Sequence, residues 1–349
     1  MKGAKKYLLT WAFISFVSLH LLLFFVLKKE KIDSILKRDK ATFPELKAEE
    51  PFYPRLEAYI ADHFPAKNSY VAQSNYLTKG ILGAANAKSQ VLWGSQHWLF
   101  YNATINDDRG LNEAYGYRAF TKAELAKIAQ NIQTIRNWCE RHQIAFELLL
   151  CPNKHSVYPE YLPMPYAQTA QQSQLDQIYD AVPQLIPLKK RLLHAKNKRF
   201  DLYYRQDTHW NKLGAYLAVK ALQKKLQSSF HFLQPFAAQP FFDKHHKEMD
   251  LANMLGLNGC LPYRNVGLLY TKKPKKKIPH LVIVHDSFLN NMLPSLKHLF
   301  TKVSPKFIFN EGLLSPEILL REKADVFVIE LVERYKTALI GDLHPDYYK

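Results

Sequence analysis

The chain has 349 residues, a formal net charge of +17 and three cysteines. Cys139, Cys151 and Cys260 are an odd number without Cys-x-x-Cys spacing, which indicates neither a zinc site nor a disulfide framework and leaves open whether one disulfide forms. No stretch interleaves basic and aromatic residues as nucleic-acid-binding motifs do, so the positive charge points to lipid headgroups or an acidic glycan and not to nucleic acid.

The N-terminus carries an apolar run from Tyr7 to Leu27. At about 1.5 Å per residue, such a run spans a hydrocarbon core of roughly 30 Å. It ends in bulky residues followed by lysines, without the small-residue site of a cleaved signal peptide. We therefore predict an uncleaved signal anchor at 7–27, a cytoplasmic N-terminus at 1–6 and a juxtamembrane linker at 28–50. Basic residues on both sides favour this orientation without fixing it.

Prolines 51 and 54 mark the entry to a folded region, so we expect one extracytoplasmic domain over 51–349. Helical spacing of apolar residues predicts a helix at Leu56–Phe64. Two short strands around a polar turn are predicted at Val91–Gly94 and Trp98–Tyr101.

A capping-box sequence at Thr121–Glu124 predicts a helix that runs to about His142. The apolar run Ile144–Leu150 then predicts a buried strand of a parallel sheet. Open α/β sheets place their sites at the carboxyl ends of strands. Asn153, just beyond this strand, is therefore a candidate oxyanion donor or, equally, a cap of the following turn. Lys154 is a candidate substrate contact.

The middle of the chain predicts a helix at Gln171–Tyr179 and a short strand at Leu202–Tyr204, which leads into Asp207-Thr208-His209-Trp210. Periodic apolar residues predict a further helix at Asn211–Leu226. Residues 228–246 combine prolines and aromatics with no clear period, which indicates an irregular insertion.

The C-terminal part alternates predicted strands and helices. These are strand Leu281–Val284, helix Leu289–Phe300, strand Phe307–Phe309, helix Pro316–Arg321 and strand Val326–Glu330. The βα alternation predicts an α/β fold with a doubly wound parallel sheet flanked by helices.

Two short motifs predict a split Ser-His-Asp triad. In an extended segment Asp207 and His209 point to the same side while Thr208 faces away, which supplies a base and the carboxylate that orients it. Ser287 follows an apolar run and precedes a predicted helix, so we expect it on a strand-to-helix turn with its hydroxyl exposed. Its amide, near a helix N-terminus, would be one oxyanion donor.

Each motif has an ordinary alternative. Ser287 alone would be a helix N-cap. Asp207 and His209 alone could bind zinc or manganese, although the sequence shows no third cluster of metal ligands. Their joint occurrence in an α/β context favours the triad, without a metal or a cofactor.

The motifs of this chain resemble those of the alginate O-acetyltransferase group of SGNH-hydrolase-like proteins. The resemblance rests on Trp98–Tyr101, Pro152–His155, Asp207–Trp210, Gly214–Tyr216, Asp250–Ala252, His285–Phe288 and Glu330–Arg334. It extends over most of the chain after residue 50 and implies a flavodoxin-like fold. In that family the Asp-x-His motif precedes the serine motif, the reverse of ordinary SGNH hydrolases, and this chain has that order.

The chain also departs from the family pattern. His285 occupies the position of the glycine in the usual Gly-Asp-Ser motif, and no separate glycine block is identifiable, which leaves the oxyanion donors open. No carbohydrate-binding module is recognisable after the core.

By motif match, the resemblance implies Ser287 as nucleophile, His209 as base and Asp207 as its orienter. The candidates for oxyanion or substrate contacts are Asn153, Lys154, Trp210 and Arg334. The implied activity is O-acetyl transfer to a cell-surface or secreted polysaccharide, with a polytopic membrane O-acyltransferase as acetyl donor. The implied location is the cytoplasmic membrane, with the catalytic domain in the periplasm. An esterase with the same triad, or a non-catalytic glycan-binding or export scaffold, are the alternatives.

Overall fold

The computed structural model describes residues 7–26, 32–33, 38–45, 51–83, 90–102, 119–163, 172–196, 199–245, 249–311, 316–343 and 347–348. The predicted cytoplasmic N-terminus at 1–6 and most of the predicted linker at 28–50 lie outside the described residues. The chain divides into two compact units, Met1–Ala84 with Ala252–Cys260, and Ala85–Leu251 with Leu261–Lys349. The expected domain boundary at residue 51 stays a prediction.

The first unit is mainly helical. Its elements are α2 (Leu8–Val26), β1 (Ile32–Asp33), β2 (Arg38–Asp39), α3 (Phe52–His63), α4 (Lys67–Asn75) and the π-helix η1 (Tyr76–Ile81). By length and composition α2 is able to cross a membrane, and a helix of this kind at an N-terminus is either an anchor or a signal sequence. His20 is the buried residue of α2, and its Nε2 lies 2.6 Å from the Tyr70 hydroxyl on α4.

The second unit is built on a parallel four-stranded sheet in the order β5-β10-β8-β9, as the βα alternation predicts. Its strands are β5 (Ala145–Cys151), β8 (Ile278–His285), β9 (Phe300–Phe307) and β10 (Val326–Val332). The central strand β10 is buried at every residue because helices cover both of its faces.

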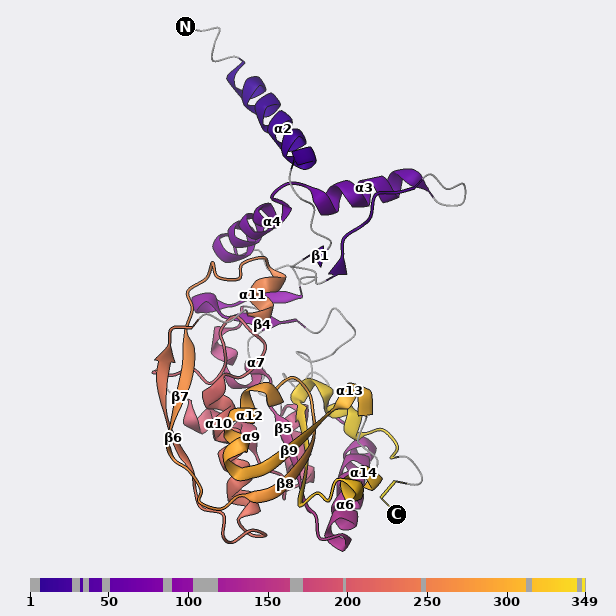
Figure 1. Ribbon diagram of the computed structural model, residues 1–349, viewed down its shortest axis with the longest axis vertical. Coiled ribbons are helices and arrows are strands. Elements are labelled where there is room, and N and C mark those ends of the chain that lie inside the picture. The colour runs from indigo at the N-terminus through magenta and orange to yellow at the C-terminus, as the bar shows by residue number, and fades with distance from the viewer. Residues whose placement is uncertain are drawn as a thin grey trace. The chain divides into compact units, whose positions relative to one another are not determined.

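Helices α9 (Leu188–Ala195), α10 (Lys212–Leu226) and α12 (Leu289–Leu299) cover one face of the sheet, and α6 (Lys122–Arg141), α8 (Gln174–Ala181) and α14 (Pro316–Arg321) cover the other. Figure 1 shows α9, α10 and α12 on one side of the strands and α6 and α14 on the opposite side. Side chains alternate along β10 accordingly: Val326 and Val328 pack with the first set, and Phe327 and Ile329 with the second. The fold is thus α/β, with a parallel sheet between two hydrophobic layers.

Several local predictions are confirmed. The Thr121 hydroxyl accepts from the Glu124 amide, and the Glu124 carboxylate accepts from the Thr121 amide at 2.7 Å, which starts α6 with the expected capping box. The two short strands form the hairpin of β3 (Val91–Trp93) and β4 (Leu99–Tyr101). The short elements of this unit are η2 (Ser95–His97), α7 (Lys154–Val157), η4 (Pro159–Tyr161), α13 (Ile308–Glu311) and η5 (Glu333–Leu339).

Other local predictions are wrong. The expected irregular insertion at 228–246 contains β6 (Ala237–Asp243), which pairs antiparallel with β7 (Asn265–Lys272); as a partly exposed strand it lacks an apolar run and even accommodates Pro240. The strand expected at Phe307–Phe309 is in fact β9, which lies earlier in the chain. The prediction missed its position because β9 pairs on one side only and therefore carries exposed polar residues. The strand expected at Leu202–Tyr204 is a single bridge between Tyr203 and Trp210. Helix α11 (Asp250–Met254) was not predicted.

Candidate active site

Three loops converge at the carboxyl ends of the parallel strands, where open α/β sheets place their sites. Asn153 and Lys154 follow β5, Ser287 follows β8, and Arg334 follows β10. The loop that precedes α10 brings His209 to the same end of the sheet.

A chain of two hydrogen bonds joins the predicted catalytic residues. The Asp207 Oδ1 lies 2.6 Å from His209 Nδ1, and His209 Nε2 lies 2.8 Å from the Ser287 hydroxyl. In the neutral tautomer with the proton on Nδ1, the ring donates to the carboxylate and accepts from the serine hydroxyl. Asp207 is buried, whereas 18% of the His209 side chain is exposed. This geometry lets a base activate a hydroxyl nucleophile.

The loop reaches this geometry by a route that differs from the expected one. The segment is a turn and not an extended strand: the His209 amide donates to Asp207 Oδ1 at 2.9 Å, and the Tyr204 amide donates to the His209 carbonyl at 3.2 Å. Aspartate side chains commonly bind the amide two residues ahead and so stabilise such turns. Thr208, expected to face away, has its Oγ1 3.2 Å from His209 Nδ1.

A second carboxylate, Asp250, joins the site. It accepts from the Thr208 amide at 2.8 Å and from the Thr208 hydroxyl at 2.5 Å, and its Oδ2 lies 3.7 Å from His209 Nδ1. Burial raises the pKa of Asp250, and the nearby charge of Asp207 raises it further. Sequence reasoning missed this role, because Asp250 entered only as part of a resemblance motif and no local pattern links residues so far apart.

Among the described residues, Asp207, His209 and Asp250 form a group that could hold a metal, since one ligand atom from each lies within 4.8 Å of the others. A divalent cation would need the deprotonated Nδ1 and both carboxylates. Hydrogen bonds to the ring, to the loop amides and to the Thr208 hydroxyl already occupy these same atoms. The donor set therefore fits an orienting network at least as well as a cation.

Lys154 is hydrogen bonded to the loop that carries His209. It is buried, and its ammonium donates to the carbonyl oxygens of Tyr204 at 3.1 Å, Arg205 at 3.1 Å and Asp207 at 2.7 Å. Burial lowers the pKa of Lys154 to about 7. These contacts make Lys154 a positioning residue, while its expected contact with a substrate stays a prediction.

Asn153 and Arg334 are hydrogen bonded to each other. The Arg334 Nη1 donates to the side-chain Oδ1 of Asn153 at 3.0 Å, and the backbone N–H of Asn153 donates to the carboxylate of the buried Glu333 at 2.8 Å. Asn153 precedes α7, but its side chain makes no capping hydrogen bond there. A cavity of about 20 Å³ is lined by both residues with Phe100, Tyr101, Lys154, His155 and Thr208. A cavity of this size has room for a water molecule.

Trp210 connects the two motifs. Its indole N–H donates to the Phe288 carbonyl at 2.9 Å, and the two rings lie 5.2 Å apart. Asn291 donates to the Trp210 carbonyl at 2.8 Å and adds a second connection. Trp210 is fully buried, so its observed contacts hold the loop of His209 against the turn of Ser287.

The turn that carries Ser287 is fixed by buried carboxyl groups. Asp286 accepts from the amides of Phe288 at 2.8 Å and Val332 at 2.7 Å. The Asp286 amide donates to Glu330, whose other oxygen accepts from the Cys151 thiol at 3.1 Å. Burial raises the pKa of Asp286 and raises that of Glu330 well above its usual range. As predicted, Ser287 lies between the end of β8 and the start of α12.

Comparison with known proteins places these motifs in a family. Residues 91–274, more than half of the chain, match the family described as SGNH hydrolase-like domain, acetyltransferase AlgX. The matched range includes Asp207, His209 and Asp250 and ends before Ser287. No curated protein sequence matches the chain.

Solved structures with a similar fold include one from Bacillus cereus and one from Pseudomonas putida. The Bacillus cereus PatB1 structure with a sulfonyl adduct has 15% identity and a TM-score of 0.50, over 72% of this chain and 96% of that one. The O-acetyltransferase domain of Pseudomonas putida AlgJ has 21% identity and a TM-score of 0.49, over 71% of this chain and 92% of that one. At such identities the PatB1 likeness speaks for the fold alone.

Proposed function

The chain belongs to the SGNH hydrolase-like AlgX acetyltransferase family, and from this premise we propose that it transfers an acetyl group to a hydroxyl of a polysaccharide through an acyl-serine. One observation supports the proposal above all: the continuous hydrogen-bonded chain from Asp207 through His209 to Ser287. Membership of the family supports a polysaccharide as the acceptor.

The proposed reaction has two halves. His209 takes the proton of the Ser287 hydroxyl while the serine oxygen attacks the acyl carbonyl of the donor; the bond to the donor breaks, and the leaving group takes the proton from His209. A sugar hydroxyl then gives its proton to His209 and attacks the acyl-serine, which releases the acetylated glycan and returns the proton to Ser287. Asp207 stabilises the imidazolium in both halves.

The tetrahedral oxyanion needs donors near Ser287. We assign the backbone amide of Ser287 as the first. Arg334 and Asn153 line the small cavity beside Thr208 and are the candidates for a second donor or for a contact with the substrate. Lys154, Trp210 and Asp250 act through the loop that holds His209, as their contacts indicate.

We further propose that α2 anchors the chain in the cytoplasmic membrane, with the catalytic domain on the periplasmic side. The length and apolar character of α2 support this placement. Acetyl-coenzyme A is confined to the cytoplasm, so a polytopic membrane O-acyltransferase would supply the acetyl group, and no cofactor is needed.

Labelling with a serine-directed fluorophosphonate probe tests the activated serine. We expect the full chain in detergent to be labelled, and Ser287→Ala and His209→Ala to lose the label. Ser304→Ala is the matched control, because Ser304 is a second serine whose Oγ lies 2.8 Å from a histidine Nε2, that of His280, yet the Nδ1 of that ring contacts a backbone carbonyl and no carboxylate. Labelling that persists in Ser287→Ala would contradict the proposal.

The acceptor is tested by the products. Incubation with an acyl donor and a polysaccharide should give acetylated glycan in excess over free acetate. Free acetate alone, with labelling intact, would make the protein an esterase with the same triad.

A further inference from the structure

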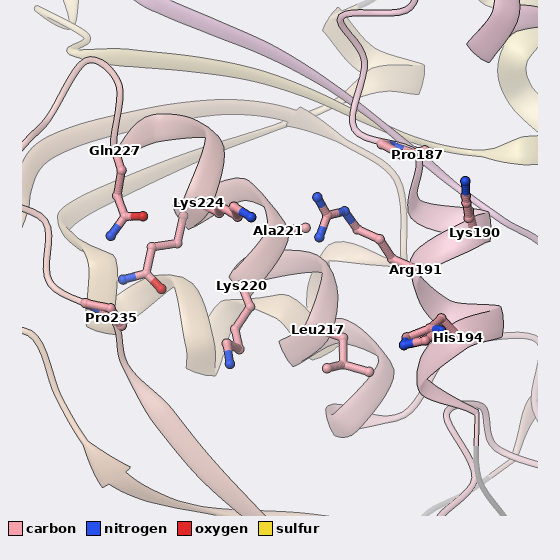
Figure 2. A pocket seen from close by; sticks show the side chains of 11 residues that line it. Pro187, Lys190, Arg191, His194, Leu217, Lys220, Ala221, Lys224, Gln227 and Pro235 are labelled. Carbon is pink, nitrogen blue, oxygen red and sulfur yellow. The ribbon is translucent and has the colours of Figure 1, made fainter.

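A basic groove lies between α9 and α10, on residues that the catalytic site does not use. Its volume is about 780 Å³, within the range of roughly 300–1,000 Å³ that is usual for ligand pockets. Figure 2 shows Arg191 pointing from α9 toward α10, with Lys220 and Lys224 projecting from α10. The basic side chains that line it are Lys190, Arg191, His194, Lys220 and Lys224.

These charges have no counter-ion within the groove. None of its lining residues is acidic, and none of the five basic side chains forms an ion pair with a described residue. Lys220 and Lys224 stand four residues apart on one helix, and such a like-charged pair costs a few tenths of a kcal/mol. The groove thus concentrates positive potential that an external anion would relieve.

The remaining lining residues narrow the class of anion. Leu217, Ala221, Pro187 and Pro235 provide apolar surface, whereas no Phe, Tyr or Trp side chain lines the groove. Single-stranded nucleic acids depend on aromatic residues for base stacking, so they are disfavoured. A concave groove also fits the flat array of lipid headgroups poorly. A polymer that carries carboxylates and also presents apolar C–H faces along its length matches both the basic and the apolar lining of the groove.

We propose that this groove is a non-catalytic binding site for an anionic polysaccharide strand. The choice of a glycan rests on the proposed function, whereas the requirement for an anion rests on the groove itself. Helix α10 begins at Lys212, three residues after His209, and Lys220 and Lys224 lie about 12 and 18 Å further along its axis. A strand held here is tethered near Ser287, which raises the local concentration of its hydroxyl groups.

The test measures binding without chemistry, in the full chain that carries Ser287→Ala. The probe is a fluorescent oligosaccharide of six uronate units, with an uncharged hexasaccharide for comparison. The groove variant is Arg191→Gln/Lys220→Gln/Lys224→Gln. The matched control, Lys272→Gln/Lys273→Gln/Lys275→Gln, removes the same charge from exposed lysines elsewhere.

We expect the groove variant to bind the uronate probe at least tenfold more weakly than the Ser287→Ala chain does. The affinity of the control variant should stay within twofold, and the uncharged probe should bind to neither variant. Equal loss in both variants would show that net charge alone attracts the probe and would overturn the proposal. Tighter binding of phosphatidylglycerol vesicles or of single-stranded DNA than of the uronate probe, lost in the groove variant, would assign the groove to another partner and also overturn it.

Failure of this proposal is separable from failure of the proposed function. Turnover of a small acetyl ester by the groove variant, with Ser287 intact, should equal that of the wild type. If the groove variant keeps both its small-ester rate and its uronate binding, only the proposal for the groove is overturned. A small-ester rate that is insensitive to Ser287→Ala overturns the function alone.

Discussion

The carboxyl end of the sheet, which we propose to be the catalytic end, and the groove between α9 and α10 use charged side chains in opposite ways. At the catalytic end, buried groups such as Asp207, Lys154 and Asp286 direct their polar atoms at named partners in the surrounding backbone. In the groove, Lys220 and Lys224 are exposed and form no ion pair with a described residue. The first region therefore depends on the position of individual atoms and the second on the number of charges, so substitutions should behave differently in the two.

The sharpest contrast should come from Asp207→Asn, which preserves shape and removes a single charge. An amide no longer favours the proton on Nδ1 of His209, so we expect kcat for acyl transfer to fall by about 10³- to 10⁴-fold, as for the comparable change in other triads. Asp180→Asn, an exposed aspartate on α8, is the control and should stay within twofold. A loss below tenfold for Asp207→Asn would mean that Asp250 alone can orient the ring.

Lys154→Met should have the next largest effect. It removes one hydrogen-bond donor from each of the carbonyls of Tyr204, Arg205 and Asp207, so the loop that carries His209 loosens. A shift of about 1 Å at a catalytic group costs on the order of 10²-fold, and we expect kcat/KM to fall by about 10- to 100-fold. Small-ester kinetics measure this. Lys220→Met is the control, and an equal loss there would remove the distinction between the two regions.

The same variant predicts a change in the pH dependence of stability. The pKa of Lys154 is about 7 in the folded chain, below the value of about 10.4 for an exposed lysine. Between these values the unfolded chain binds a proton that the folded chain has released, so the free energy of unfolding should rise with pH from about 7 to 10. The slope is at most about 1.4 kcal/mol per pH unit. Denaturant unfolding of Lys154→Met should lack this rise, whereas Lys220→Met should keep it.

Asp250→Asn should act more gently, about 3- to 10-fold on kcat. It removes a negative charge 3.7 Å from His209 Nδ1 and so makes the imidazolium less stable. The acid limb of the pH–rate profile should therefore move to lower pH, which a purely structural role would not cause. The control Thr208→Ser retains the hydroxyl that binds Asp250 and should keep both the rate and the pH–rate profile. If the profile does not move in Asp250→Asn, the role of Asp250 is limited to holding the loop.

Single groove substitutions should have the smallest effects. We expect Lys220→Gln and Lys224→Gln each to weaken uronate binding by about two- to threefold, because the side chains act through charge and not through one shared geometry. Binding measured at several salt concentrations checks this. One lysine that accounts for the whole effect would mean that the groove recognises a fixed anion, as the catalytic end does.

Local sequence patterns predicted the framework of the fold well. The capping box at Thr121 and the apolar runs of β5, β8 and β10 gave α6, the parallel sheet and the loops that meet at its carboxyl end. The three strands are buried on both faces, so their sequences carry strong signals. Edge elements such as β6 and β9 were missed or misplaced because half of each is exposed.

The loop that carries Asp207 and His209 shows what local sequence patterns cannot predict. The pairing of Asp207 with His209 was expected from strand alternation, but a turn stabilised by the Asp207 side chain produces it. The contacts of Lys154 and Asp250 with this loop could not be predicted, because they join residues more than forty positions apart through hydrogen bonds that leave no periodic trace.

The position of β10 in the sheet has a consequence for how the protein matures. Of the four strands of this sheet β10 comes last in sequence, yet it lies between β5 and β8, which do not pair with each other. Until residues 326–332 insert, the sheet exists as separate pieces, and Asp286 lacks the Val332 amide that holds the serine turn. Pairing of this kind, remote in sequence, forms slowly. Ser287 should therefore stay inert until residues 326–332 have been made and inserted, and become reactive only at that step of folding.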